Sequence, residues 1–160
     1  MANSAGIALG SDFHFDLTRP GLALYGGIAH AKLHGAVRQV VVPQSRILQI
    51  RKFAAGATIG YNAIYTARHE MAVATLAIGY ADGYFRGFSN SGSVSITGID
   101  CPVVGRVSMD LITVDVSNIP ALSEGDWCDI NFDLGTASRC SGMSQYELLT
   151  GLNHRAERQW

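Results

Sequence analysis

Residues 71–86 read MAVATLAIGYADGYFR and join a strand-like run to a glycine-rich loop that carries a tyrosine. Residues 71–78 are mostly apolar and of types that fit a buried strand. The glycines at positions 79 and 83 allow a tight or left-handed backbone around Tyr80. The stretch therefore predicts a rigid strand that delivers the phenol of Tyr80 to a loop.

Strand signals also dominate the sequence around this stretch. Further strands are expected at residues 36–42, 47–53, 93–97, 103–107, 111–116 and 127–131. Sequences of turn composition separate them, at residues 54–57, 87–92, 98–100 and 124–126. The spacing predicts a mainly β fold, a small and at least partly closed β-barrel with Greek-key-like connections. One short C-terminal helix is expected, with Ser141 or Ser144 as its N-cap.

The size and composition of the chain limit what it can do. A chain of 160 residues fits one domain with a sizeable core. The formal net charge of −1 and the charged fraction of 16% leave no basic stripe for nucleic acid. Every apolar run ends well before the length of about 18 residues that a membrane helix needs, and the N-terminus lacks a secretory signal pattern. We therefore expect a cytoplasmic protein with small-molecule or protein partners.

Cysteines and histidines give no sign of a disulfide framework or a metal site. Cys101, Cys128 and Cys140 are odd in number and lack Cys-x-x-Cys spacing, so we expect reduced, structural thiols. His30 and His34 have helical spacing, but no Glu or Cys accompanies them to complete a ligand set. We expect no bound metal.

We call residues 79–86 the Tyr80 loop, and two further blocks share its design. They are VVGRVSMD at residues 103–110 and RPGLALYG at residues 19–26. In this order the three blocks resemble the C-terminal part of alanine racemases, pyridoxal-phosphate enzymes that interconvert L- and D-alanine. The resemblance implies that residues 31–160 form the family's C-terminal β domain. It also implies that residues 1–30 are a remnant of the end of its pyridoxal-phosphate-binding (β/α)8 barrel.

The resemblance implies a racemisation chemistry that needs two bases, one for each face of the substrate α-carbon. In the family, a lysine that also holds the cofactor serves one face, and a tyrosine from the partner subunit of a homodimer serves the other. Tyr80 matches that tyrosine, and Arg86 or Arg106 would supply the positive charge that favours a phenolate. From residue type alone, Tyr80 is instead a half-buried aromatic whose hydroxyl bonds to backbone.

The resemblance also implies a cofactor cradle near the N-terminus. Arg19 matches the arginine that bonds the pyridine nitrogen of the cofactor, although an arginine before Pro-Gly is otherwise an ordinary exposed turn residue. Ser4 and the backbone amides of Gly21 and Leu22 match positions that hold the cofactor's phosphate.

A third set of residues corresponds to the family's substrate site. The backbone amide of Met109 matches a contact to the substrate carboxylate, and Asp110 matches an acid that helps to hold the loop. Arg106 lies where the family lines its substrate entryway with charge. The alternatives are that Asp110 caps its own turn and that Arg106 is an ordinary surface residue.

Several positions depart from the family pattern. Residues 60–62, Gly-Tyr-Asn, replace Gly-Tyr-Gly, and Phe85 stands where proline is usual. The tail lacks the family's phosphate-binding tyrosine, which leaves the role of His154 open. The cofactor-bearing lysine has no match, since Lys32 and Lys52 lie in other contexts. We therefore expect the chain to be inactive alone and to need its own N-terminal barrel domain.

Two other interpretations remain open at the level of sequence. One is a pyridoxal-phosphate amino-acid decarboxylase of similar architecture, although the only Cys-Asp pair, residues 128–129, lies in an expected strand. The other is a non-catalytic β module for dimer assembly or regulation. The residues also leave open whether the substrate is alanine or serine.

Overall fold

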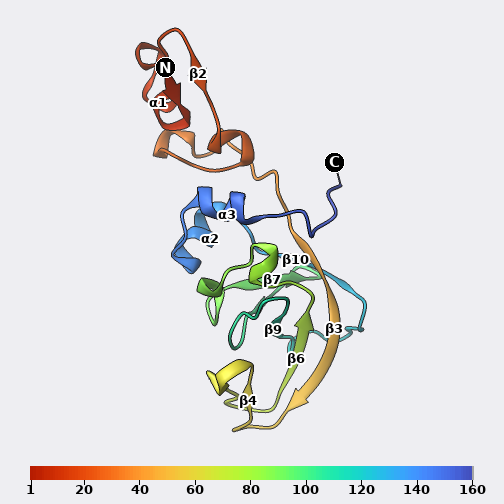
Figure 1. The fold of residues 1–160 in the computed structure, drawn as a ribbon. Coiled ribbons are helices and arrows are strands. Elements are labelled where there is room, and N and C mark those ends of the chain that lie inside the picture. The colour runs from red at the N-terminus through yellow and green to blue at the C-terminus, as the bar shows by residue number, and fades with distance from the viewer. Residues whose placement is uncertain (160) are drawn as a thin grey trace.

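The computed structural model of the chain describes residues 1–159. An N-terminal segment projects from one end, a curved sheet forms the body, and two C-terminal helices lie between them (Figure 1). In chain order the strands and α-helices are β1 Ala2–Asn3, α1 Ser4–Leu9, β2 Thr18–Arg19, β3 Gln44–Phe53, β4 Thr58–Ile59, β5 Tyr65–Thr66, β6 Met71–Leu76, β7 Ser93–Ile96, β8 Ile99–Pro102, β9 Ile112–Asp115, β10 Trp127–Ile130, α2 Leu134–Ser141 and α3 Gln145–Gly151.

The body is built on one curled antiparallel sheet. Within the described residues it has six strands in the order β8-β7-β10-β3-β6-β9, and all neighbours run antiparallel. Just past the end of β8, Val103 forms a bridge with Val114 of β9, and the Val104 amide donates to the Thr113 carbonyl at 2.8 Å. The two outer strands thus meet at this point, which protects sheet edges that would otherwise stay unpaired.

Strand β6 is central because it is buried on both of its faces. Ala74 and Leu76 belong to the main core between the sheet and the helices, whereas Met71 and Val73 belong to a smaller cluster. A strand covered on both faces reads as a continuous apolar run, which is why residues 71–78 gave so clear a signal. The mainly β character of the body, with helices at the C-terminal end, is confirmed.

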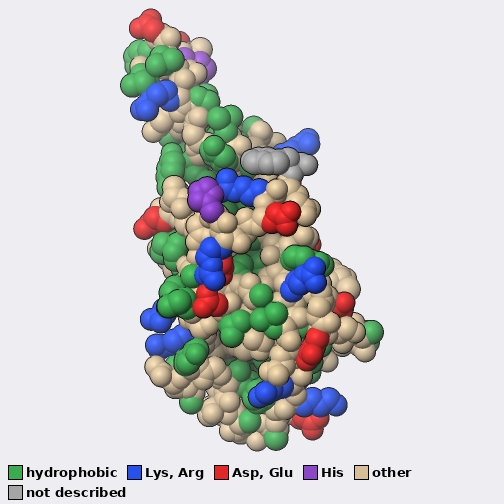
Figure 2. Space-filling model, turned by 45° about the vertical axis from the view of Figure 1, so that its right-hand side comes forward, with side chains coloured by type: hydrophobic (Ala, Val, Ile, Leu, Met, Phe, Trp, Pro, Cys, Tyr) green, Lys and Arg blue, Asp and Glu red, His purple; other side chains and the backbone are tan. Residues whose placement is uncertain are grey.

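The N-terminal segment has little core of its own. Its short strands β1 and β2 pair in parallel, and the Asn3 side chain caps α1 by accepting a hydrogen bond from the Gly6 amide at 3.0 Å. Large apolar side chains such as Phe13 and Phe15 are exposed, and Figure 2 shows hydrophobic surface on this part of the molecule. That residues 1–30 are the end of a (β/α)8 barrel remains a prediction.

Two of the expected strands are wrong. Residues 36–42 form no strand, because the valines there lack a neighbouring strand to pair with and Val40 and Val42 stay exposed. Residues 103–107 contribute only the bridge at Val103, while β8 occupies residues 99–102 and overlaps the turn expected at residues 98–100. The turn itself is tighter and centres on Thr97 and Gly98, which both have positive φ.

The C-terminal end holds two helices where one was expected. Ser144 is confirmed as the N-cap of α3, with a capping box to Glu147. Ser141 instead ends α2, whose N-cap is Asp133. Helix α2 reads LGTASRCS and buries only Leu134 and Ala137, so its apolar stripe is too short to have revealed it. No helix among residues 1–159 combines the length and apolar character needed to cross a membrane.

Candidate active site

The loop that carries Tyr80 is held in shape by its own backbone. Residues Tyr80–Asp82 form a 3₁₀ turn directly after β6, and the Gly79 amide donates to the Asp82 carboxylate at 2.8 Å. Gly83 closes the turn with a φ of 96°, and a Cβ there would lie 2.7 Å from the Gly151 carbonyl oxygen. This position therefore requires glycine for both its conformation and its space.

The Tyr80 loop packs backbone to backbone against the loop at residues 105–111, which we call the Met109 loop. The Tyr80 amide donates to the Ser108 carbonyl at 3.0 Å, and the Ala81 amide donates to the Met109 carbonyl at 2.9 Å. A Cβ on Gly79 would come within 2.4 Å of the Met109 carbonyl oxygen. The structure thus brings two of the three sequence blocks into direct contact.

The side chain of Tyr80 lies at the edge of the core with its hydroxyl free. The residue is half-buried and packs against the main core cluster. The Arg86 guanidinium carbon lies 5.0 Å from the centre of the ring, a cation–π contact that orients the phenol. Within residues 1–159 the hydroxyl makes no hydrogen bond, and it is not among the buried unpaired atoms. The alternative in which this hydroxyl bonds to backbone is therefore wrong for the part of the chain described.

The Met109 loop presents an amide and a carboxylate at the surface. The Ser108 hydroxyl holds the loop, since it donates to the Leu111 carbonyl at 2.9 Å and accepts from the Leu111 amide at 3.0 Å. Met109 is 54% exposed, and its amide has no acceptor among residues 1–159. Asp110 does not cap its own turn, so that alternative is wrong; it accepts a hydrogen bond from Arg155 at 2.7 Å.

The predicted entryway residue, Arg106, is the second residue of the same loop. It is half-buried, and its backbone nitrogen would lie 3.3 Å from a Cβ placed on Gly60. The Gly60-Tyr61-Asn62 departure therefore lies directly against the Met109 loop. The structure records no ion pair for Arg106 within residues 1–159, and its proposed role stays a prediction.

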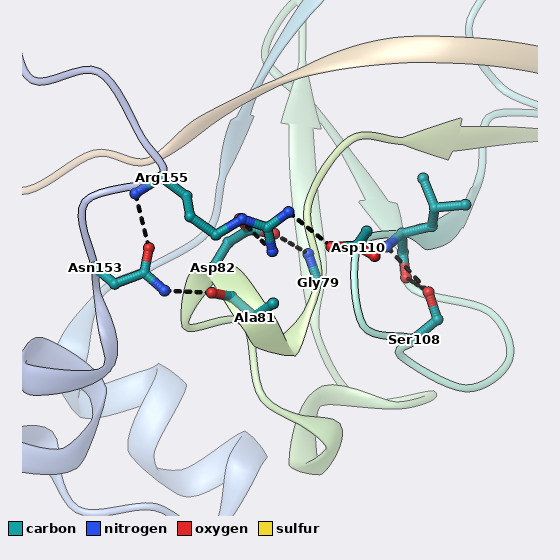
Figure 3. Close-up of polar contacts among 8 residues, drawn as sticks. Gly79, Ala81, Asp82, Ser108, Asp110, Asn153 and Arg155 are labelled. Atoms are coloured by element: carbon teal, nitrogen blue, oxygen red, sulfur yellow. Dashed lines mark hydrogen bonds and ion pairs between the residues drawn. The ribbon is translucent and has the colours of Figure 1, made fainter.

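Two residues of the C-terminal tail complete this cluster, and neither was among the site residues predicted from the sequence. Arg155 lies between Asp82, at 3.4 Å, and Asp110, at 2.7 Å (Figure 3). Asn153 donates to the Ala81 carbonyl and accepts from the Arg155 amide at 2.9 Å. The hydrogen bond to Asp110 and the charge of Asp82 raise the pKa of Arg155 above its already high ordinary value. The neighbouring His154, whose role the sequence left open, is exposed.

The predicted phosphate residues also come together, in the N-terminal segment. Ser4 is 1% exposed, and its hydroxyl oxygen accepts hydrogen bonds from the amides of Gly21 at 3.1 Å and Ala23 at 3.2 Å. The Leu22 amide, between them, has no acceptor among residues 1–159. The Ser4 hydroxyl hydrogen and the Leu22 amide have no acceptor among residues 1–159, and two such donors close together fit a phosphate group, whereas the Gly21 amide already donates to Ser4.

The rest of the cofactor site is only partly represented in the chain. Arg19 pairs with Asn3 across β1 and β2 and lines an open cavity of about 270 Å³ together with Phe13 and Phe15. No lysine lines this cavity within the described residues. Lys32 is hydrogen-bonded to the Leu9 carbonyl at 3.4 Å. Ser4, Gly21 and Leu22 are not among the residues that line this cavity, so the place of the cofactor ring beside Arg19 stays a prediction.

Thiols and histidines form no second site. The three cysteines are free, and burial raises the pKa of Cys101 and Cys128 to about 11 each. Cys128 lies inside the sheet, where its thiol is 3.3 Å from the Ser45 carbonyl oxygen. Such a thiol is protonated and enclosed, which argues against the decarboxylase interpretation of residues 128–129. Among residues 1–159, no cluster of three or more His, Cys, Asp or Glu could hold a metal.

Known proteins resemble this chain along its whole length. The family "Alanine racemase, C-terminal domain" matches residues 40–160. The biosynthetic alanine racemase of Agrobacterium fabrum is 40% identical over 176 residues, which cover 100% of this chain and 45% of that protein.

Solved structures agree with the sequence match. The alanine racemase of Bartonella henselae, solved with covalently bound pyridoxal phosphate, has a TM-score of 0.87 and 40% identity, and covers 99% of this chain and 45% of that one. The enzyme from Acinetobacter baumannii has a TM-score of 0.88 and 34% identity, and covers 99% and 46%. The chain therefore spans less than half the length of these relatives. It belongs to the alanine racemase family, in which it corresponds to the C-terminal domain.

Proposed function

We propose that this chain supplies the tyrosine base and the substrate-carboxylate site of a homodimeric, pyridoxal-phosphate-dependent alanine racemase. One observation carries the proposal: the free hydroxyl of Tyr80 stands on a loop that is hydrogen-bonded directly to the Met109 loop. A proton donor and a carboxylate-binding amide are thereby held at a fixed spacing, as proton transfer at an α-carbon requires.

Tyr80 would give a proton to the α-carbon on one face and take it back in the reverse direction. The hydroxyl is open to substrate because it makes no hydrogen bond within residues 1–159. The 3₁₀ turn and the Arg86 contact restrict where the ring can point. A fixed phenol loses little freedom when substrate arrives, and this is how an enzyme makes a weak base effective.

The Met109 amide would bind the substrate carboxylate. Its N–H has no acceptor in the described part of the chain, while its carbonyl is already engaged by Ala81. The hydrogen bond from the Ala81 amide to the Met109 carbonyl fixes the plane of the peptide that follows the free N–H. The arrangement supports recognition of an amino acid by its carboxylate. We propose alanine, an amino acid with a small side chain, as the substrate.

The cofactor would be held by residues from the other end of the chain. Pyridoxal phosphate, when bound, takes up the negative charge that remains after the α-proton leaves. Ser4 and the amides of Gly21 and Leu22 would hold its phosphate, and Arg19 would lie near its ring. An arginine cannot accept a proton, so it would leave the pyridine nitrogen unprotonated.

The two sets of residues do not meet within one chain. No hydrogen bond or ion pair joins residues 1–26 to residues 79–110 in the part that the structure describes. This separation supports a site completed between protomers, in which the Tyr80 loop of one copy faces the cofactor cradle of another. It also supports our expectation that the chain requires a separate lysine-bearing barrel.

A chimera tests the proposal. This chain would replace the matching part of the Agrobacterium fabrum relative, and alanine racemisation would be measured with pyridoxal phosphate present. We expect activity in the chimera and none in the 160-residue chain alone. In the chimera, Tyr80→Phe should reduce exchange of the α-proton from one alanine enantiomer at least about 100-fold more than from the other, because general acid–base groups contribute about that much.

Tyr146→Phe is the matched control, because Tyr146 is a half-exposed tyrosine on α3, away from the Tyr80 loop. It should leave both exchange rates unchanged. Equal losses from both enantiomers in the Tyr80→Phe chimera would contradict the role of Tyr80 as a one-face base. A folded chimera without activity would favour the non-catalytic β module instead.

A further inference from the structure

We propose that Arg155 is a positioning residue that clamps the Tyr80 loop to the Met109 loop through two carboxylates. The catalytic consequence rests on the proposed function, whereas the clamp itself is defined by the contacts of Arg155 with Asp82 and Asp110. Its starting point is that one guanidinium contacts one acidic residue from each loop, with a different nitrogen for each (Figure 3).

On the Tyr80 loop, the C-terminal tail is connected to the residues on both sides of Tyr80. Asp82 receives Arg155 Nη1 on one carboxylate oxygen at 3.4 Å and the Gly79 amide on the other at 2.8 Å. Asp82 therefore ties the tail to the residue that precedes Tyr80. Asn153 adds a second tie, since its side-chain amide donates to the Ala81 carbonyl, on the other side of Tyr80.

The contact on the Met109 side is a single strong hydrogen bond. Arg155 Nη2 donates to Asp110 Oδ1 at 2.7 Å, a length typical of charge-assisted bonds. Asp110 follows Met109, so the tail reaches the peptide next to the proposed carboxylate-binding amide. The tail thus spans the junction at which the Ala81 amide donates to the Met109 carbonyl.

The geometry explains why an arginine occupies this position. Two acids from separate loops would repel one another without a cation between them, and a planar guanidinium presents two nitrogens in a fixed fork. A lysine offers one ammonium point charge in place of that fork. Arg155 is about half exposed, so the clamp should contribute little to global stability and act mainly on the spacing of the loops.

Amide hydrogen exchange in the 160-residue chain tests the clamp without any reference to activity. In Arg155→Met, the Tyr80 and Ala81 amides should exchange about fivefold faster, a modest effect because the ion pairs are exposed. Arg155→Lys should lie between Met and wild type. Arg51→Met, at an exposed arginine on β3 with no ion pair in the described residues, is the matched control and should change neither amide.

Kinetics in the chimera test the catalytic consequence. Arg155→Met should lower kcat/KM for alanine about tenfold while the thermal midpoint changes little, because small displacements of catalytic groups are costly. Arg155→Lys should recover only part of that loss, since it restores the charge and not the fork.

The outcomes separate the two proposals. Unchanged exchange at Tyr80 and Ala81 in Arg155→Met would overturn the clamp, whatever the activity. Faster exchange together with a chimera that does not racemise alanine would support the clamp and count against the proposed function. If kcat/KM of the Arg155→Met chimera falls only in proportion to the fraction of folded protein, Arg155 has a structural role alone. Full recovery of kcat/KM in Arg155→Lys would mean that the charge suffices. Either result would overturn the positioning role of Arg155.

Discussion

The sheet body at residues 44–151 and the N-terminal segment at residues 1–43 bury apolar side chains very differently. In the sheet body most strands and both helices contribute to one main core, beside the smaller cluster that includes Met71 and Val73. In the N-terminal segment the buried apolar side chains are Ala2 and Leu22, whereas Leu24 and Phe15 are more than 60% exposed. The comparison shows that the proposed base stands on a unit with its own core, while the proposed cofactor cradle does not.

The two regions are joined through helix α3. Gln145, at its start, accepts a hydrogen bond from the Ile28 amide at 2.8 Å and donates to the Ile28 carbonyl at 3.1 Å. The same side chain lies near Gly27, beside Leu22. A single side chain that pairs with both the N–H and the C=O of one residue acts as a local anchor, so the N-terminal segment should open separately from the sheet body.

The largest effect should come from breaking the core of the sheet body. Leu76 on β6 is 0% exposed, so Leu76→Ala should cost about 2–5 kcal/mol in the free energy of unfolding, as buried leucine truncations do. Leu24→Ala, at a leucine that is 63% exposed in the other region, should cost less than about 0.5 kcal/mol. Urea unfolding followed by circular dichroism measures both, and similar costs would refute the contrast between the two regions.

A smaller effect should follow from cutting the link between them. Gln145→Ala removes both hydrogen bonds to Ile28, and two such bonds contribute about 2 kcal/mol together. We expect faster exchange of the Ile28 amide and faster proteolysis within residues 28–43, with little change in the unfolding of the sheet. Gln49→Ala, at an exposed glutamine on β3, is the control. A global loss of stability in Gln145→Ala would show that the two regions unfold as one.

The sequence predicted well the parts whose signals are local. The apolar run of β6 and the glycines around Tyr80 stand next to one another in the chain, and the structure places a strand and a tight turn there. Ser144, followed by Glu147 three residues later, predicted the start of α3 for the same reason. In these places a few neighbouring residues contain the whole physical cause of the structure.

The sequence predicted poorly what depends on contacts between distant segments. Residues 36–42 have strand composition but find no partner strand, whereas β8 forms over residues 99–102 because β7 lies beside it. Arg155 was not among the predicted site residues, because its role depends on Asp82 and Asp110, which are 73 and 45 residues away along the chain. Only folding brings these three charges together, and the Ser4 cradle likewise depends on the parallel pairing of β1 and β2.

The smallest predicted effect concerns α2, a helix of the sheet body, and it depends on pH. The Asp133 side chain accepts from the Thr136 amide at 2.8 Å, and hydrogen bonds from Thr136 hold the pKa of Asp133 below its ordinary value. A carboxylate with a lowered pKa stabilises the fold above its unfolded pKa of about 4, and the contribution is lost as the pH falls through the folded value.

Asp133→Ala should therefore cost about 1 kcal/mol at pH 7, as the loss of an N-cap does. Its difference from wild type should shrink as the pH falls from 7 to below about 4, by only part of that amount because the carboxylate is exposed. Asp133→Asn keeps a cap without a titrating group, so it should match wild type at pH 7 and lose less stability on acidification. Urea midpoints across this pH range measure all three proteins. A constant gap between Asp133→Ala and wild type would show that the ionised carboxylate adds nothing to the cap beyond its hydrogen bond.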